Sequence, residues 1–302
     1  MRTDFYYPSR GAGSIHGCCW SPEEEPKAVV QIVHGIAEHV QRYDEFARYL
    51  NEQGYLVVAE DHMGHGQSIG KKGVQGYFHG GWFAAVEDTY QLLRDTRREY
   101  PGIPYFLLGH SMGSFMVRTL LCRYPDSGIS GVILSGTGWM PNAVLNVGVA
   151  ACKAFPEKEP NEKLQKLMFG GYNARVEHPN TAYDWLSRDK RIVNAYMEDP
   201  LCGFTATTGL QRDMMTGILY IQNRKNIEQM QKELPVLFVA GADDPVGNYG
   251  KGVQSAADAF KTVGMERVDV KLYPLCRHEI LNEINRKDIF EDLKKWIEKT
   301  LN

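Results

Sequence analysis

The chain has 302 residues, of which 43% are hydrophobic and 24% are charged, and its formal net charge is −3 at pH 7. These proportions are ordinary for a globular protein, and without a basic surplus they give no indication of binding to nucleic acid or to an anionic membrane. The length suits a single α/β core that carries an insertion.

The six cysteines and the apolar stretches of the chain predict a cytoplasmic protein. The cysteines have no C-x-x-C spacing and no histidines at zinc-finger intervals, so we expect buried free thiols in a reducing compartment. The N-terminal sequence MRTDFYYPSRGAG has no apolar core and does not resemble a signal peptide. The longest apolar stretch, residues 143–155, is interrupted by Asn146 and Lys153 and is too short to span a bilayer.

Short runs that are almost continuously apolar predict strands buried on both faces of a sheet. In chain order they are residues 28–33, 55–60, 105–110, 131–136 and 236–241, followed by the strand-like residues 268–273. Amphipathic segments between them predict helices at residues 45–54, 82–100 and 287–299. This alternation predicts an α/β fold with a mostly parallel central sheet and helices on both faces.

The alternation stops between residues 140 and 230, where the pattern predicts no strand. Helical patterns fill this region at residues 161–169, 181–197 and 209–223. We therefore expect a helical cap inserted above the sheet. The predicted organisation is a first part of the core at 1–139, the cap at 140–230 and a second part of the core at 231–302.

The sequence GHSMG, residues 109–113, matches the nucleophile elbow G-x-S-x-G. In that motif a serine lies on a sharp turn between a strand and a helix, and the flanking glycines avoid clashes with neighbouring backbone. A tight turn of small residues without catalysis is the alternative. Because the pentapeptide follows an apolar run and precedes a helical pattern, Ser111 is the candidate nucleophile.

A serine nucleophile needs a histidine base, and the base needs a carboxylate that holds its tautomer. In this architecture the chain order is serine, acid, histidine. Two adjacent aspartates, at 243 and 244, lie just after the predicted strand at 236–241, and His278 follows the last strand-like run. Ser111, Asp244 and His278 thus occur in the required order, each after a strand, where α/β sheets place their sites.

Acyl transfer also requires two N–H donors for the oxyanion. One is the main-chain N–H of Met112, which follows the candidate nucleophile. The other is expected from the loop after an early strand, and the N–H of Ile36 in His34-Gly35-Ile36 is its candidate. A glycine turn that leads into a helix is compatible with the same residues.

Several segments together carry a family resemblance: HGIAEHVQRY, AEDHMGHGQS, GHSMGS, AGADDPVG and RHEILNE. They resemble the monoacylglycerol lipase and lysophospholipase group of α/β hydrolases, also labelled serine aminopeptidase-like, over nearly the whole chain. The resemblance implies an α/β-hydrolase fold, no cofactor, and the triad and oxyanion donors named above. It implies Asp244 as the acid, with Asp243 as the fallback. The family's glycine–alanine–glycine oxyanion loop reads Gly35-Ile36-Ala37 here, and the bulkier Ile36 narrows the acyl side of the expected pocket.

The implied activity is hydrolysis of carboxylic esters by an acyl-enzyme mechanism, with monoacylglycerols or similar single-acyl lipids as substrates. Lysophospholipid, thioester and general carboxylester hydrolysis are the alternatives. An aminopeptidase would need an acidic group for the substrate amine, and Glu38, Glu157 and Glu159 are available, although nothing singles them out. A ligand-binding homologue without catalysis is disfavoured by the intact serine, aspartate and histidine set.

The spacing of the histidines and glycines disfavours two rival sites. The histidines at 34, 39, 62 and 65 lack the H-x-H-x-D-H run of metallo-hydrolases, and the resemblance makes His62 and His65 structural, so we expect no metal. The stretch GHGQSIGKK does not have the spacing of a phosphate-binding loop or of a dinucleotide fingerprint.

Leu210, Met214 and Ile218 share one face of the predicted helix at 209–223. The simpler interpretation is that this face packs the cap onto the body. The functional interpretation is that it lines an acyl channel above Ser111, for which adaptable methionines are suited. The expected partners are a small acyl-ester substrate and, transiently, a membrane surface met through the cap. No nucleic acid is expected, and the sequence does not indicate the oligomeric state.

Overall fold

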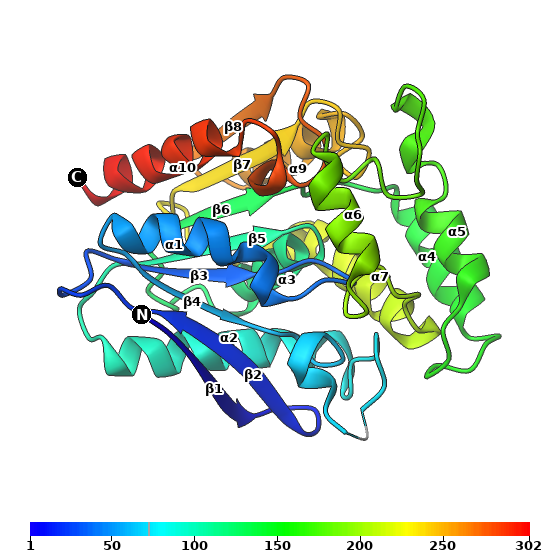
Figure 1. Cartoon of the computed structure of the whole chain (residues 1–302), viewed down its shortest axis with the longest axis horizontal. Coiled ribbons are helices and arrows are strands. Elements are labelled where there is room, and N and C mark those ends of the chain that lie inside the picture. The colour runs from blue at the N-terminus through cyan, green and yellow to red at the C-terminus, as the bar shows by residue number, and fades with distance from the viewer. Residues whose placement is uncertain (72) are drawn as a thin grey trace.

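The computed structural model describes residues 1–71 and 73–302 and contains an eight-stranded sheet in the order β1-β2-β4-β3-β5-β6-β7-β8 (Figure 1). Strands β3 to β8 run parallel to one another, whereas β2 is antiparallel to both β1 and β4. The mostly parallel sheet confirms the predicted α/β architecture. The strands are β1 (Arg2–Pro8), β2 (Ser14–Trp20), β3 (Val29–Val33), β4 (Leu56–Glu60), β5 (Tyr105–His110), β6 (Gly131–Ser135), β7 (Val236–Gly241) and β8 (Val268–Tyr273).

Helices cover both faces of this sheet (Figure 1). They are α1 (Asp44–Glu52), α2 (Gly81–Glu99), α3 (Met112–Arg123), α4 (Asn142–Cys152), α5 (Glu162–Phe169), α6 (Lys190–Glu198), α7 (Thr208–Gln222), α8 (Arg224–Ile227), α9 (Lys251–Thr262) and α10 (Arg286–Leu301). Alternate residues of β3 enter different cores: Val30 and Ile32 join α1 and α10, whereas Val29 and Val33 join α2, α3, α7 and α9. This alternation follows from the two-residue period of a strand.

The N-terminal hairpin of β1 and β2 is an element that the sequence pattern did not predict. Its strands pair antiparallel, with Asp4 opposite Cys18 and Tyr6 opposite His16. Strand β1 is mostly exposed or half-buried and has no continuous apolar run. The prediction relied on such runs, so it found the strands at the centre of the sheet and missed this edge.

The segment 140–230, which the structure describes throughout, contains helices and an isolated bridge between Pro160 and Thr207 but no strand. The helix predicted at 181–197 is shorter than expected, because α6 begins only at Lys190. Asp189 caps α6 by accepting a hydrogen bond from Arg191 N–H. Before it, the carboxylate of Asp184 accepts bonds from Asn180 N–H, Thr181 N–H and the Thr181 hydroxyl, and this local turn replaces the first half of the predicted helix.

The packing of α7 corrects the prediction for Leu210, Met214 and Ile218. All three side chains are buried in the core shared with α2 and α3. Gly217 lets α7 approach closely, because a Cβ there would overlap the Trp82 ring. The apolar face of α7 therefore packs onto the body, which is the simpler of the two interpretations.

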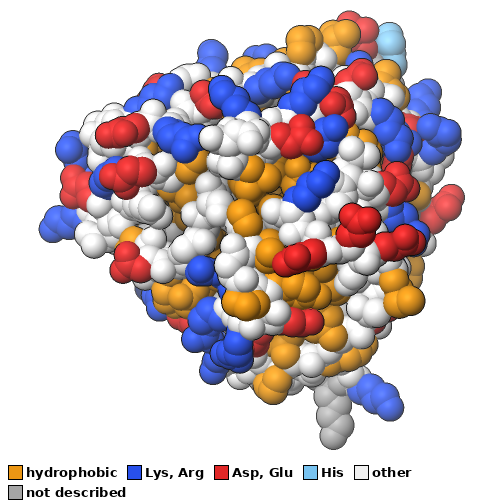
Figure 2. All heavy atoms as spheres, turned by 90° about the vertical axis from the view of Figure 1, so that its left-hand side faces the viewer, with side chains coloured by type: hydrophobic (Ala, Val, Ile, Leu, Met, Phe, Trp, Pro, Cys, Tyr) orange, Lys and Arg blue, Asp and Glu red, His pale blue; other side chains and the backbone are white. Residues whose placement is uncertain are grey.

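Basic and acidic side chains are interspersed over the face of the molecule opposite α4 and α5, with apolar side chains between them (Figure 2). Among the described residues, no helix is long and apolar enough to cross a bilayer. The six cysteines are all free thiols, and Cys19 alone among them is not fully buried.

Candidate active site

Ser111 lies on the turn between β5 and α3 with φ of 51° and ψ of −120°. A positive φ is uncommon for a residue with a side chain and is found where the surrounding structure imposes it. The Ser111 N–H donates to Ser135 O at 2.9 Å, and its carbonyl accepts from Ser114 N–H at 2.9 Å. The turn thus holds the serine at the carboxyl end of the sheet.

The two glycines of GHSMG are required by close backbone contacts. A Cβ at Gly109 would lie 2.6 Å from the carbonyl oxygen of Gly113. A Cβ at Gly113 would overlap the carbonyl oxygen of Val33 at the end of β3. The glycines therefore allow α3 to start directly against the ends of β3 and β5, as the motif predicts.

His278 and Asp244 form a buried pair, in which Nδ1 of His278 lies 3.0 Å from Oδ1 of Asp244. The same carboxylate oxygen accepts a hydrogen bond from Val246 N–H at 2.9 Å. Asp244 is fully buried, whereas Asp243 is exposed. The structure thus brings Asp244, and not Asp243, to the histidine.

The two histidines near Ser111 have opposite pKa shifts. Burial alone would lower the pKa of His278, but the charge of Asp244 and the hydrogen bond to it outweigh burial, so the pKa is raised. His110 lies beside it, with 4.7 Å between the ring centroids. Burial and the charge of His278 lower the pKa of His110 to about 4. His278 is therefore the ring prepared to take up a proton, while His110 stays neutral.

The loop after β3 presents Ile36 to the cavity that contains Ser111. Glu38 stabilises this loop, because its Oε1 accepts from Gly35 N–H at 2.6 Å and from the Tyr43 hydroxyl at 2.8 Å. Met112 begins α3, and N–H groups in the first turn of a helix have no helical partner. The two predicted donors thus lie on separate segments with defined backbone geometry, one in the cavity that contains Ser111 and one directly after Ser111 in the chain.

Histidines 34, 62 and 65 hold the loops behind Ile36 through main-chain contacts. Nε2 of His34 accepts from His62 N–H at 3.0 Å, and Nε2 of His62 lies 3.0 Å from His34 O. Nδ1 of His65 lies 3.1 Å from Met63 O. Burial lowers the pKa of His34 and lowers that of His65 to about 3, so both rings are neutral. These contacts join the loop after β3 to the loop after β4.

A buried cation links the loop of Ile36 to the loop of His278. The Arg42 guanidinium donates to both carboxylate oxygens of Glu279 at 2.6 Å and to Glu38 at 2.7 Å. A bidentate pair holds the guanidinium and the carboxylate in one relative orientation and also balances their charges. Arg42 and Glu279 were not predicted as site residues from the sequence, because a buried, paired arginine has the same sequence signal as an exposed one.

The cavity above Ser111 has a volume of about 350 Å³. Ser111, His278, Ile36 and Glu38 form its floor. Its upper wall comes from residues 162–206, which we call the roof: Glu162, Gln165, Lys166, Phe169, Gly170, Ala182, Tyr183, Trp185, Leu186, Tyr196, Gly203, Phe204, Thr205 and Ala206. Leu210, Met214 and Ile218 are not among the lining residues, so the structure does not bring them to Ser111.

The roof is connected to the histidine loop through the main chain. Trp185 O accepts from His278 N–H at 3.3 Å, and Leu186 O accepts from Glu279 N–H at 2.8 Å. The Trp185 ring also packs on the His278 ring, with 5.1 Å between centroids. His278 is therefore held both by Asp244 and by the roof.

The arrangement combines a serine on a strained turn, a buried histidine bonded to a carboxylate, and main-chain N–H groups beside the serine. This set of groups can activate a hydroxyl, stabilise an oxyanion and form an acyl intermediate. The mostly apolar cavity would accept a substrate with an apolar arm.

Comparisons with known proteins identify the family of the chain. Residues 24–285 match the model of a family described as serine aminopeptidase, S33. The chain is 31% identical over 303 residues to a monoacylglycerol lipase of Mycolicibacterium smegmatis, covering 98% of this chain and 97% of the relative. It is 30% identical over 283 residues to the human monoglyceride lipase, covering 92% of this chain and 84% of that protein.

A solved structure gives the same result for the fold. A highly thermostable carboxyl esterase from Bacillus coagulans, solved in complex with glycerol, superposes with a TM-score of 0.92. It is 30% identical, and the superposition covers 100% of this chain and 99% of the esterase.

Proposed function

Because the chain belongs to the serine aminopeptidase S33 family of α/β hydrolases, we propose that it is a serine hydrolase that cleaves carboxylic esters with a single acyl chain, most characteristically monoacylglycerols. The observation that carries the proposal is the His278–Asp244 pair, with 3.0 Å between Nδ1 and Oδ1, in which His278 lines the cavity that contains Ser111. The lipase and esterase names of the relatives support ester hydrolysis as the reaction.

The proposed mechanism begins with attack of Ser111 Oγ on the ester carbonyl carbon while His278 Nε2 takes the hydroxyl proton. The N–H groups of Ile36 and Met112 stabilise the oxyanion of the tetrahedral intermediate. When the intermediate collapses, His278 returns the proton to the leaving alcohol and an acyl-serine remains. Water, deprotonated by His278, then attacks this acyl group and releases the acid. Asp244 keeps the His278 ring in place and stabilises its cationic form.

The cavity walls suggest how a single-acyl substrate would lie. Ile36, Phe169 and Phe204 offer apolar surface to an acyl chain. Gln165 and Lys166 of α5 and Glu162 at its start offer polar groups to a small alcohol such as glycerol. A general carboxylesterase is the second candidate, supported by the 30% identity to the Bacillus coagulans esterase. Lysophospholipid and thioester hydrolysis use the same chemistry and are tested by the same panel.

The three glutamates considered for an aminopeptidase, Glu38, Glu157 and Glu159, do not suit that role. Glu38 is occupied by Arg42, Tyr43 and Gly35 N–H. Glu157 bonds to the Tyr77 hydroxyl and pairs with Arg212, and neither it nor Glu159 lines the cavity. None of the three is therefore a free carboxylate positioned for a substrate amine.

We also infer transient contact of the cap (residues 140–230) with a membrane surface, from which the substrate would be taken. Val144 and Val147 of α4 are 57% and 70% exposed, and Leu167 of α5 is 81% exposed. Cosedimentation with phosphatidylcholine vesicles tests this, and Val147→Asp together with Leu167→Asp should reduce it without changing hydrolysis of a soluble acetyl ester. Equal sedimentation of both proteins would remove the inference.

The test of the proposed function is fluorophosphonate labelling followed by a substrate panel. The protein should be labelled once, at Ser111, and Ser111→Ala should not be labelled. The panel contains acyl esters of increasing length, monoacylglycerols, lysophosphatidylcholine, an acyl thioester and aminoacyl amides. Highest kcat/KM on monoacylglycerols supports the proposal, whereas highest kcat/KM on aminoacyl amides overturns it.

A further inference from the structure

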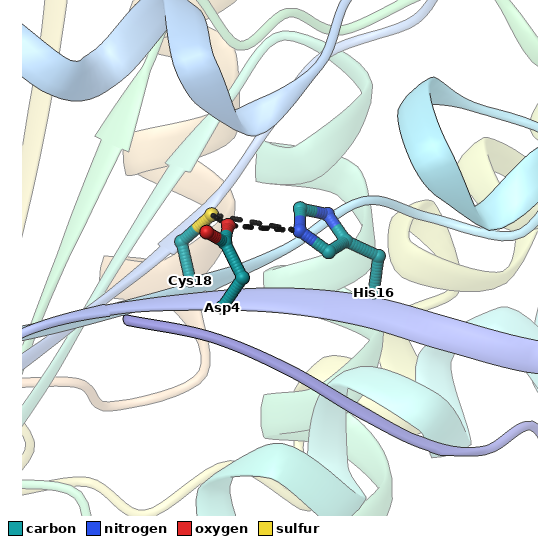
Figure 3. A group of neighbouring side chains, drawn as sticks. All are labelled: Asp4, His16 and Cys18. Atoms are coloured by element: carbon teal, nitrogen blue, oxygen red, sulfur yellow. Dashed lines mark hydrogen bonds and ion pairs between the residues drawn. The ribbon is translucent and has the colours of Figure 1, made fainter. Parts of the chain in front are cut away.

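Three side chains that commonly bind metals meet on the N-terminal hairpin, outside the active-site cavity (Figure 3). His16 and Cys18 lie two residues apart on β2 and so share a face, and Asp4 is the cross-strand partner of Cys18. Asp4 Oδ1 lies 3.0 Å from His16 Nε2 and 3.1 Å from Cys18 Sγ, and Sγ lies 3.9 Å from Nε2. Three different ligand atoms therefore converge on one point.

We propose that Asp4, His16 and Cys18 form a binding site for Zn²⁺, with water as a fourth ligand. Atoms that bind a tetrahedral zinc ion at about 2.0–2.3 Å lie about 3.2–3.7 Å apart. The three observed separations fall on both sides of that range, so shifts of a few tenths of an ångström complete the site. A thiolate, an imidazole and a carboxylate together suit zinc better than calcium or magnesium. Binding replaces the thiol proton of Cys18, which passes to solvent, and no oxidation is involved.

A second layer of contacts orients the histidine as zinc sites require. His16 Nδ1 lies 2.8 Å from Asp61 Oδ2, so Nε2 points to Asp4 and Cys18. Asp61 is held in turn by Val40 N–H and Gln67 N–H, each at 2.9 Å. His16 N–H also donates to the Ser68 hydroxyl at 2.8 Å. The ring is thus fixed by the protein before any metal binds.

Burial and exposure give the site both a rigid base and an entrance. His16 and Cys18 are fully buried, whereas the Asp4 side chain is 47% exposed. An ion from solvent would meet Asp4 first and then reach the imidazole and the thiol. This path is separate from the cavity of Ser111.

Arg2 now supplies the positive charge that the proposed ion would replace. Its Nη2 lies 3.0 Å from Asp4 Oδ1 and 3.4 Å from Cys18 Sγ. Alternative contacts for the guanidinium are nearby, since Nη1 lies 3.9 Å from Asp44 Oδ1 and the group lies 5.6 Å from the Trp20 ring. Arg2 therefore competes with the metal and can withdraw without losing a charged partner.

The test is a titration of the metal-free full-length protein with Co²⁺, which reports thiolate ligation through a charge-transfer absorption band. We expect one equivalent of Co²⁺ to produce this band and one equivalent of Zn²⁺ to abolish it. Cys18→Ser should remove the band, and Asp4→Asn should weaken Co²⁺ binding at least tenfold. Arg2→Met should tighten binding several-fold, because the competing cation is removed.

The neighbouring Cys19 provides a matched control, because it lies on the opposite face of β2 and its Sγ contacts Ser21. Cys19→Ser should keep the full band, as should Cys202→Ser in the other group of potential ligands, His39, Asp199 and Cys202. Zn²⁺ should also raise the Tm of the wild type and of Cys19→Ser but not that of Cys18→Ser. A wild type without the band, or a band that Cys18→Ser retains, would mean that the three side chains form only a hydrogen-bonded cluster, and the proposal would be wrong.

Discussion

The catalytic loops and the roof differ in what holds them. Ser111, Asp244 and His278 lie on loops at strand ends that are fixed by glycine contacts, buried hydrogen bonds and the Arg42 ion pairs. The roof packs mainly through half-buried side chains, and Leu167 on its first helix is exposed. In the proposed function the body would determine which bond is broken and the roof which substrate is held, and we expect that the two can be altered separately.

The largest effect that separates the two regions is expected from Ser111→Ala. Removal of the nucleophile should lower kcat for ester hydrolysis by about 10⁴–10⁶ and leave the Tm nearly unchanged. The measurement is kcat on a short and a long ester, together with a thermal melt. A variant with wild-type kcat would show that the catalytic centre lies elsewhere.

The next effect distinguishes the two adjacent aspartates. Asp244→Asn should lower kcat by about 10⁴, because the amide stabilises the wrong tautomer of His278. Asp243→Asn is the matched control, and its exposed side chain should give less than a several-fold change. The opposite order of effects would make Asp243 the acid.

A smaller effect should show which side chains of the cap (residues 140–230) pack onto the body and which bind the substrate. Met214→Ala removes buried volume from the core and should cost about 2–5 kcal/mol of stability. Activity on short and long esters should then fall in the same proportion. Phe169→Ser should leave the Tm nearly unchanged but flatten the rise of kcat/KM with acyl length, which is worth about 0.8 kcal/mol per buried CH₂.

The ratio of kcat/KM on an octanoyl ester to that on an acetyl ester is the measurement that compares these variants. It should fall in Phe169→Ser and stay constant in Met214→Ala. If this ratio fell in Met214→Ala and not in Phe169→Ser, the acyl channel would lie along the apolar face of α7.

The smallest effect is a shift in pH dependence. Because His278 is the proposed base and its pKa is raised, the acid limb of kcat/KM should lie above pH 6.5, the ordinary value for a histidine. The same shift stabilises the folded state fully below the unfolded-state pKa, and this contribution is lost as pH rises through the folded-state pKa. Over the same pH range activity should therefore rise while this contribution to the free energy of unfolding is lost. An acid limb well below pH 6 would contradict the proposal that His278 is the base.

The strands predicted correctly from sequence are mainly those whose burial on both faces requires an apolar residue at nearly every position. Continuous apolar runs indicated strands β3 to β7, because both faces of those strands are buried. The alternating pattern of VDVKLY indicated β8, which is mostly exposed or half-buried. The hairpin of β1 and β2 was missed because it is half exposed and its cluster of Asp4, His16 and Cys18 depends on cross-strand register. The register between two strands is set by the folded structure and cannot be read from one segment. The two-residue spacing of His16 and Cys18 indicated only that both would lie on the same face of a strand.

The candidate site divides in the same way. The order and strand-end positions of Ser111, Asp244 and His278 can be read locally, because each follows a strand. The lining of the cavity by Phe169, Trp185 and Phe204 cannot, since these residues lie on separate segments that meet only in the folded roof. Amphipathicity alone does not distinguish an apolar face packed on the body from one facing a substrate, and for α7 this led to the wrong choice of lining residues.

The positive φ of Ser111 has a consequence for how the chain acquires its reactivity. The turn is imposed by Gly113 against the end of β3 and by the bond from Ser111 N–H to Ser135 O at the end of β6. A nascent or partly folded chain lacks these supports, and its serine would relax to an ordinary, unreactive conformation. Labelling by a fluorophosphonate therefore counts natively assembled molecules, and its time course after dilution from denaturant should follow completion of the central sheet and not the earlier appearance of helices.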